Sequence, residues 1–360
     1  MNTKSALIAL SGGVDSSVAA LLMQKMGYHC TGATMRLYTG QDLADDADTS
    51  ALHAGAEDAR AVATRLGMDF HILDAADEFR EKVMDHFTAC YESGLTPNPC
   101  IQCNRYMKFD YFLDKALELG CHKIVTGHYA RIEFDEVSGR YLLKKAANAA
   151  KDQSYFLYTL NQHQLSHTCF PLGGMTKEEV RAIAEENGLI NARKRDSQDI
   201  CFVPDGDYFS FLQRFTGKTY ESGDFLDLNG KVVGSHKGAV GYTLGQRKGL
   251  GLAMGAPVYV CGKDMACNTV TVGPNEALFT KELVAKDWNW IAFPTLNESI
   301  RCKAKARSRM TEQAATVYPM ENGLAKVVFD EPQRAMTPGQ AIVLYDADTV
   351  VGGGTITEIL

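Results

Sequence analysis

Residues 5–17 read Ser-Ala-Leu-Ile-Ala-Leu-Ser-Gly-Gly-Val-Asp-Ser-Ser, an apolar run that passes directly into a turn of small residues. The apolar part, Ser5–Leu10, has the length and composition of a buried strand. Helical spacing follows over Ser16–Met26 and ends at Gly27, a residue type common at helix C-termini. This stretch therefore predicts a strand, a tight loop and a helix in immediate succession.

The loop between the strand and the helix has the composition of a phosphate-binding site. Gly12 and Gly13 let the backbone pass close to a ligand, while hydroxyl donors from three serines join the helix amides. These serines are Ser11, Ser16 and Ser17. The loop lacks the G-x-x-x-x-G-K-S/T pattern, so a kinase or GTPase P-loop is not indicated.

The same loop carries one carboxylate, Asp15. A carboxylate beside phosphates repels them unless a cation intervenes, so Asp15 is a candidate ligand of Mg²⁺ or a catalytic acid. The alternative is an ordinary glycine turn in which Asp15 and Ser16 cap the helix.

From Ser5 to about Tyr129, short apolar runs alternate with amphipathic segments, as in βαβ units. We expect an α/β fold with a doubly wound parallel sheet, whose ligands bind outside the carboxyl ends of the strands. The further elements expected here are strands at Tyr28–Met35, Phe70–Leu73 and His122–Thr126, a helix over Ala51–Leu66, a hairpin formed by Arg131–Asp135 and Arg140–Lys144, and a capped helix over Thr176–Asn187.

Beyond about Asp205, helical patterns become scarce and glycine-punctuated strands follow one another. The expected strands include Lys231–Gly234, Val258–Cys261, Thr269–Val272, Ala325–Phe329 and Ala341–Tyr345. The chain is therefore predicted to comprise a catalytic α/β domain over 1–204, a small β-rich domain over 205–280 and a C-terminal β-barrel over 281–360.

The composition is that of an ordinary folded protein. The 360 residues are 45% hydrophobic and 22% charged, with a net charge of −7, and two or three domains are expected from this length. No apolar run approaches the roughly 18–20 residues of a membrane helix, and Met1–Leu10 does not resemble a signal peptide, so we expect a cytoplasmic protein. With a net negative chain, any polyanionic partner must be bound by a local basic patch.

Ten cysteines in such a chain do not predict a disulfide framework. Cys30 and Cys261 lie in apolar strand patterns and are expected to be buried. Cys103, in contrast, follows two prolines and precedes a helix expected near Asn104–Leu119, and a helix N-terminus favours the reactive thiolate. The alternative for Cys100 and Cys103 is half of a zinc site, although a second C-x-x-C is absent.

Cys201 is the third cysteine that stands out. It follows the basic run Arg193-Lys194-Arg195 and the string Asp196-Ser197-Gln198-Asp199. Nearby positive charge would also favour a thiolate at Cys201, although burial explains this cysteine equally well when it is taken alone.

The loop at Ser11–Ser17 resembles that of the N-type ATP pyrophosphatases, which cleave ATP between the α- and β-phosphates and adenylate their substrates. Combined with the cysteines, the whole chain closely resembles the tRNA-specific 2-thiouridylases. The strings that carry this resemblance are the loop, Thr126–Tyr129, Lys151–Leu157, Asp196–Phe202, Gly245–Gly251 and Thr337–Gln340.

The resemblance implies the site residues and the reaction partners. Cys103 would be the nucleophile and Cys201 the persulfide carrier, while Asp15 is a catalytic candidate because of its charge beside the phosphates. The implied ATP contacts are Ala9, Leu10, Ser11, Gly12, Gly13, Val14, Asp15, Ser16, Met35 and Gly127. The implied contacts to tRNA and its target base are Asn98, Pro99, Cys100, His128, Lys151, Asp152, Gln153, Arg307, Ser308 and Gln340. ATP, Mg²⁺, tRNA and a cysteine desulfurase or sulfur-relay protein are the implied cofactors and partners.

One departure from the family pattern concerns Cys100. Some members carry aspartate at this position, and a cysteine does not take over an acid–base role. Cys100, Cys103 and Cys201 could instead hold three irons of a 4Fe–4S cluster whose fourth iron binds sulfide. Persulfide chemistry and a cluster are both open at this point.

A second basic segment alternates cations with small residues. An extended strand would place its five cations on one face, suited to a phosphate backbone. These cations are Arg301, Lys303, Lys305, Arg307 and Arg309. Their alternative is a solvated edge strand that resists aggregation. Lys144, Lys145 and Lys151 add basic candidates, while Tyr155 and Phe156 are expected in the core rather than stacked on a base.

The expected reaction begins with an extruded wobble uridine whose carbonyl oxygen attacks the α-phosphate of ATP. Sulfur from a Cys201 persulfide then replaces that oxygen, either directly or after Cys103 releases sulfide and leaves a Cys103–Cys201 disulfide. The competing interpretations are a small-molecule adenylating ligase, which needs no paired cysteines, and a tRNA-binding module with a degenerate loop.

Overall fold

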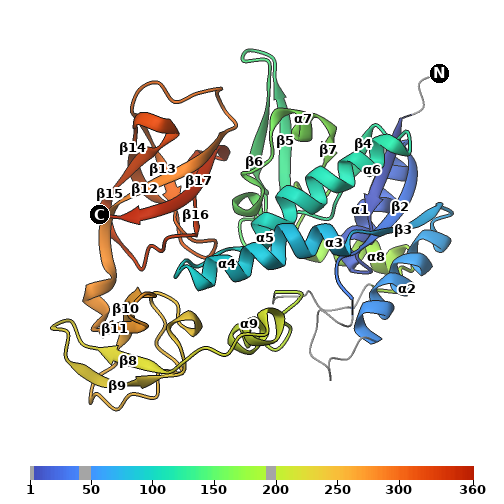
Figure 1. Ribbon diagram of the computed structural model, residues 1–360. Coiled ribbons are helices and arrows are strands. Elements are labelled where there is room, and N and C mark those ends of the chain that lie inside the picture. The colour runs from blue at the N-terminus through green and yellow to red at the C-terminus, as the bar shows by residue number, and fades with distance from the viewer. Residues whose placement is uncertain (1–3, 40–49, 192–199) are drawn as a thin grey trace.

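The computed structural model describes residues 4–39, 50–191 and 200–360. It confirms the expected α/β class followed by a small β-rich unit and a barrel (Figure 1). The first sheet is parallel, in the order β3-β2-β1-β4-β7. Its strands are β1 (Ser5–Ala9), β2 (His29–Arg36), β3 (Phe70–Asp74), β4 (Lys123–Val125) and β7 (Thr168–Cys169).

Alternation along β1 explains how both faces of this sheet are covered. Leu7 points into one core with the helical segment 99–118, whereas Ala6 and Ile8 point into the other core. The second core is covered by α1 (Val14–Lys25), α2 (Ser50–Arg65) and α8 (Lys177–Glu186). The strand order reverses between β1 and β4, so the carboxyl ends of these two strands form the switch point where ligands bind in such sheets.

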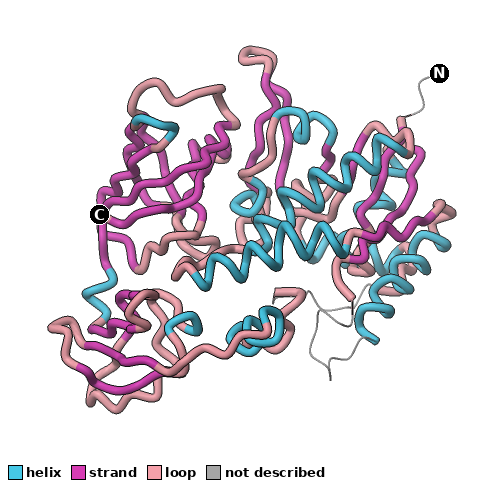
Figure 2. The backbone as a smooth tube through the Cα atoms, viewed as in Figure 1, coloured by secondary structure: helices cyan, strands magenta, loops and turns pink. Residues whose placement is uncertain are grey.

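Two helical segments cross the middle of the molecule and pack against each other (Figure 2). The first comprises α3 (Ala76–Phe79), the π-helix η2 (Arg80–Asp85) and α4 (His86–Glu92). The second comprises α5 (Pro99–Gln102), the π-helix η3 (Cys103–Tyr111) and α6 (Phe112–Glu118). The expected helix near Asn104–Leu119 therefore starts earlier, because Pro99 is favourable in a first turn that has no hydrogen bond to lose. Cys100 and Cys103 lie inside the helix rather than ahead of it.

The second half of the chain is mostly β-structure, as expected. Its smaller sheet has the order β10-β11-β8-β9, and pairing of β12 with β17 closes a six-stranded barrel. The strands are β8 (Gly223–Leu226), β9 (Val232–His236), β10 (Tyr259–Asp264), β11 (Thr269–Gly273), β12 (Phe279–Trp290), β13 (Ile300–Lys305), β14 (Gln313–Pro319), β15 (Ala325–Arg334), β16 (Ala341–Asp346) and β17 (Thr349–Ile359). The remaining helices are η4 (Ser154–Leu157), α7 (Gln162–His167), α9 (Tyr208–Thr216), η5 (Ala239–Gly241), η6 (Asn275–Leu278) and η7 (Glu321–Gly323).

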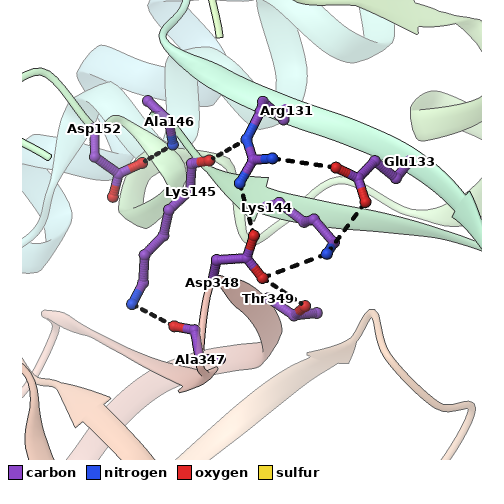
Figure 3. A network of polar contacts seen from close by, with 9 residues as sticks. All are labelled: Arg131, Glu133, Lys144, Lys145, Ala146, Asp152, Ala347, Asp348 and Thr349. Atoms are coloured by element: carbon purple, nitrogen blue, oxygen red, sulfur yellow. Dashed lines mark hydrogen bonds and ion pairs between the residues drawn. The ribbon is translucent and has the colours of Figure 1, made fainter. Parts of the chain in front are cut away.

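The predicted hairpin is present as β5 (Ala130–Asp135) and β6 (Arg140–Lys145), and β6 pairs with β17, so the hairpin extends the barrel sheet. An ion-pair network fixes this junction (Figure 3). Asp348 accepts from Arg131 at 2.6 Å and from Lys144 at 3.3 Å, and Lys144 also pairs with Glu133. Lys145 pairs with Glu312 at 2.7 Å. Lys144 and Lys145 were expected as basic sites for RNA; both are instead neutralised by carboxylates at this junction.

Within the described ranges, no helix combines the length and apolarity needed to cross a membrane.

Candidate functional site

A cleft of about 280 Å³ opens at the carboxyl ends of β1 and β4, where the fold predicts a ligand. It is lined by many of the residues that the sequence assigned to ATP. These are Ala9, Leu10, Ser11, Asp15, Ser16, Met35 and Gly127, joined by His128 and Gln153. Gly12, Gly13 and Val14 belong to the same loop but do not line the cleft: Gly13 is the N-cap of α1 and Val14 is buried beneath it.

Two glycines allow the phosphate loop to pack closely against its neighbours. Gly12 has φ +71°, and a Cβ there would lie 2.6 Å from the carbonyl oxygen of Gly55. A Cβ on Gly127 would lie 2.9 Å from the backbone of Asp15 and from the amide nitrogen of Ser16. Both positions therefore need the missing side chain of glycine.

The serine hydroxyls divide between the cleft and the protein. Ser16 donates to the carbonyl of Gly13 and lies within 3.3 Å of the Ser11 hydroxyl, at the cleft wall. Ser17 is fully buried, donates to the same carbonyl and accepts from Asn191 at 2.7 Å. The expectation that Ser17 binds phosphate is therefore wrong, because its hydroxyl is used to hold the loop.

Asp15 already has a cation beside it. Both of its carboxylate oxygens accept from Nζ of Lys177 at 2.8 Å, and Tyr129 donates to one of them. Lys177 is 6% exposed and lies in the first turn of α8. The helix-capping alternative for Asp15 also fails, because the N-cap of α1 is Gly13 and receives no side-chain hydrogen bond. In this conformation the positive charge beside Asp15 is therefore that of Lys177.

Replacing Lys177 with methionine is expected to lower the free energy of unfolding by about 1–3 kcal/mol, because the partly buried carboxylate of Asp15 loses its counter-charge. Chemical denaturation measures this loss. Lys115→Met is the matched control, since Lys115 pairs with Glu118 on an exposed helix face and should matter little. Equal stability of the two variants would contradict the role of the Lys177–Asp15 pair.

His128 lies in the wall of the cleft rather than on an open surface. It is 9% exposed, and its Nδ1 is 2.7 Å from the hydroxyl of Thr126. Burial, helped by the positive charge of Lys108, holds the pKa of His128 well below its ordinary value. The imidazole is therefore neutral at physiological pH.

The structure brings the three singled-out cysteines together. Cys100, Cys103 and Cys201 lie close enough for the charge of one thiolate to raise the pKa of another. Tyr38 donates its hydroxyl to the carbonyl oxygen of Cys201 at 2.9 Å, which ties the segment 200–203 to the end of β2. Cys103 shares its core cluster with Phe202 and Val203.

The thiols are not activated in the way that the sequence suggested. Although Cys100 and Cys201 are exposed residues, desolvation of their thiols raises the pKa of Cys201 to about 12 and also raises the pKa values of Cys100 and of the buried Cys103. The basic run Arg193-Lys194-Arg195 and the string Asp196–Asp199 lie outside the described residues.

Lys108 is a site residue that the sequence analysis missed. It lines the cleft, and its positive charge lowers the pKa values of Cys100, Cys103 and Cys201 against the effect of burial. It follows Cys103 by five residues in the π-helix η3, whose i to i+5 hydrogen bonds bring such residues to nearly the same side. A helical pattern read at 3.6 residues per turn does not reveal this relation.

All ten cysteines are free thiols. Over the described ranges, no three or more His, Cys, Asp or Glu side chains are grouped so as to hold a metal ion. The zinc alternative for Cys100 and Cys103 therefore finds no further ligands among the described residues.

The pKa of Cys201 predicts its alkylation behaviour. Below its pKa, the thiolate fraction of a cysteine rises about tenfold per pH unit, so labelling of Cys201 by iodoacetamide should still climb between pH 8.5 and 10. Peptide mass spectrometry can follow this rate, with the exposed Cys267 as an internal reference. A plateau near pH 8.5 would contradict the raised pKa of this thiol.

Several residues that the resemblance assigned to tRNA make contacts within the protein. Gln340 donates to the carbonyl oxygens of Thr96 and Pro97, so the barrel holds the segment that leads to Asn98 and Pro99. Asp152 accepts from the amides of Ala146 and Ser154 and is a structural residue.

Gln153 and Lys151, also assigned to tRNA, make hydrogen bonds within the protein as well. Gln153 accepts from the amide of Tyr129 and lines the cleft, and Lys151 follows the turn at Asn148. Tyr155 is buried as expected and donates to the carbonyl of Ala341.

The proposed row of five cations is wrong. Strand β13 ends at Lys305, so Arg307 and Arg309 lie in the turn that follows. Arg307 donates to Thr337 and to the carbonyl of Leu244, and burial lowers its pKa. Ser308 is half-buried in that turn. Only Arg301, Lys303 and Lys305 belong to the strand, and Arg301 pairs with Asp330.

Three family models match the chain in succession. The tRNA methyl transferase HUP domain covers residues 4–205, the tRNA methyl transferase PRC-barrel domain covers 209–274, and the aminomethyltransferase beta-barrel domain covers 280–356. The tRNA-specific 2-thiouridylase MnmA of Clostridioides difficile is 47% identical over 357 residues, which span 99% of this chain and 99% of that protein. The protein of the same name from Acetivibrio thermocellus is 47% identical over 362 residues, 99% of this chain and all of that one. A solved complex of a 4-thiouridine synthetase with RNA and ATP has a TM-score of 0.37 and 20% identity over 59% of this chain and 50% of that chain, too remote to support an argument.

Proposed function

Because the chain belongs to the tRNA-specific 2-thiouridylase family, we propose that it replaces the carbon-2 oxygen of the wobble uridine, position 34 of tRNA, by sulfur at the expense of ATP. The observation that carries this proposal is the position of Lys108, which lines the cleft of the phosphate loop and also acts electrostatically on three thiols. Adenylation and sulfur transfer can therefore take place on one base held between them.

ATP would bind in the cleft with its phosphates at the loop 11–17, where the first amides of α1 supply donors. Mg²⁺ would arrive on the ATP phosphates and neutralise part of their charge. The carbonyl oxygen of the uridine attacks the α-phosphate and displaces pyrophosphate, which leaves an adenylated base. In this arrangement Asp15 positions the loop through Lys177 rather than acting on the substrate.

The sulfur step would use Cys201 and Cys103. The outer sulfur of a Cys201 persulfide attacks carbon-2, AMP leaves with the former carbonyl oxygen, and Cys103 attacks the inner sulfur of Cys201 to free the thiocarbonyl. The alternative order has Cys103 release sulfide first. Both orders end with a Cys103–Cys201 disulfide, which a dithiol reductant must reopen, and both need a sulfur-donor protein such as a cysteine desulfurase to restore the persulfide.

The division of labour we propose assigns catalysis to residues 1–204, support to 205–280 and tRNA binding to the barrel over 281–360. Gln340 supports this assignment, because it links the barrel to the segment before Asn98. We expect this reaction to take place in the cytoplasm.

The test is the release of pyrophosphate and the formation of 2-thiouridine with purified protein, ATP, a persulfide donor and a tRNA with U34. We expect both products only with that tRNA, and a tRNA carrying C34 should give neither. Pyrophosphate release without tRNA, or with a small amide acceptor alone, would assign the chain to small-molecule adenylation instead.

A further inference from the structure

A rigid pair of indoles stands on the barrel strand β12, away from the thiols and the loop. Trp288 and Trp290 stack with ring centroids 4.7 Å apart and an angle of 2° between the rings. The facing strand β17 carries glycines, and a Cβ on Gly354 or Gly352 would lie within about 3 Å of these rings. The indole of Trp288 also donates to the carbonyl of Ala285 at 2.9 Å. Its position is therefore fixed.

A β-bulge beside Trp288 sets the direction of its side chain. The register of β12 against β17 shifts between Lys286 and Asn289, and Asp287 has a left-handed φ of +53°. Bulges redirect side chains and are common beside functional sites, and a non-glycine residue with positive φ is a strained position that the fold must support.

Trp288 lines a groove of about 430 Å³ between β12 and the π-helix η3, within the size range of ligand pockets. Arg105, Tyr106 and Asp110 line the groove from the helix, and Asp287 lines it from the bulge. A neighbouring cavity of about 400 Å³ shares Arg105, Tyr106 and Asp287 with it and extends to Asn98 and Gln102, beside Cys100 and Cys103. The groove thus adjoins a cavity that reaches Asn98, one of the residues assigned to the target base.

The chemistry of the groove suits a nucleobase rather than a phosphate. Two carboxylates, of Asp110 and Asp287, face a single guanidinium, that of Arg105. The two carboxylates give the groove a net negative charge, which repels an anion. Their oxygens can accept hydrogen bonds from the N–H groups of a base edge. Thr159 lines the groove, and its buried hydroxyl has no hydrogen-bond partner among the described residues.

We propose that this groove is a second base-binding subsite, in which Trp288 stacks on an unstacked nucleobase of the anticodon loop next to the target uridine. The inference rests on the proposed function. An anticodon loop that extrudes one base loses the stacking of its neighbours, and an aromatic platform restores it. The subsite would hold the loop open while the target base reaches the thiols.

The two tryptophans of the chain are both in this stack, so intrinsic fluorescence reports on it directly. The Trp290→Phe protein keeps an aromatic ring in the stack and leaves Trp288 as the sole tryptophan, which excitation at the red edge selects over the tyrosines. We expect its emission to be quenched by an anticodon stem-loop RNA with U34. One abasic position in the loop, adjacent to U34, should remove the quench and weaken binding, whereas an abasic position in the stem-loop far from U34 should not.

A second test replaces Trp288 itself and measures RNA binding. Trp288→Ala should weaken binding of the stem-loop by about 5- to 150-fold, the range measured for loss of one base–aromatic stack, and Trp288→Phe should restore most of it. Thermal melting with and without ATP checks that the variants are folded. The effect should appear in KM for tRNA, with KM for ATP unchanged.

Three results would overturn the inference. If the RNA binds and is thiolated while the emission of Trp288 and the affinity of Trp288→Ala stay unchanged, the subsite is wrong although the proposed function stands. If only a sulfur-donor protein quenches Trp288, the groove belongs to that protein. If the stem-loop is neither bound nor thiolated, the proposed function fails and the subsite fails with it.

Discussion

Cys103→Ser and Cys201→Ser are each expected to lower the formation of 2-thiouridine by at least about 10³-fold, the scale seen when a catalytic nucleophile is removed. A serine hydroxyl can neither carry a persulfide nor form the disulfide that frees the thiocarbonyl. Release of pyrophosphate in a single turnover should survive in both variants, because adenylation does not use the thiols. Quantification of thiolated nucleoside and of pyrophosphate from the same reaction separates the two steps.

Cys267→Ser is the matched control, since Cys267 is an exposed thiol in the small β-rich unit and should be dispensable. Cys100→Ser distinguishes the two sulfur chemistries. Persulfide transfer needs only Cys103 and Cys201, so Cys100→Ser should retain activity within about tenfold. A loss equal to that of Cys103→Ser, together with iron and acid-labile sulfide in anaerobically purified protein, would show that a cluster is required.

Gly127→Ala is expected to have the second largest effect, which is a weaker binding of ATP. The added Cβ would lie 2.9 Å from the backbone of Asp15 and from the amide of Ser16, so the phosphate loop must move. Overpacking of this kind costs about 1–3 kcal/mol, and we expect it to appear as a rise in KM for ATP of about 5- to 150-fold. Affinity for the stem-loop RNA without ATP should be nearly unchanged.

Gly174→Ala provides the comparison, because no atom lies within 4 Å of the Cβ that it would add. It should leave both ATP affinity and stability unchanged. Normal ATP affinity in Gly127→Ala would mean that the cleft at the carboxyl ends of β1 and β4 is not the nucleotide site.

The sequence predicted those structural elements that are specified by residues next to one another in the chain. The β1-loop-α1 succession, the capping box at Thr176 and the hairpin β5–β6 were found because each is specified by residues next to one another. The sequence also singled out Cys103 and Cys201, and the structure places them near each other.

The rest depends on contacts that no local pattern contains. Lys177 reaches Asp15 across 162 residues, and Lys108 relates to Cys103 through a π-helix whose spacing differs from that of an α-helix. The alternating cations suggested a longer β13, but Arg307 turns inward to Thr337 and ends the exposed row. The thiol pKa values were expected to fall because charge can be read from sequence, whereas burial, which dominates them, cannot.

The fate of the uridine oxygen tests the central claim, that the base is adenylated before sulfur arrives. A stem-loop RNA with ¹⁸O at carbon-2 of U34 should be thiolated in a single turnover with ATP and a persulfide donor, and the AMP should be analysed by mass spectrometry. The account predicts one ¹⁸O in each AMP formed with 2-thiouridine. Thiolated RNA accompanied by unlabelled AMP, or by ADP and phosphate, would contradict it.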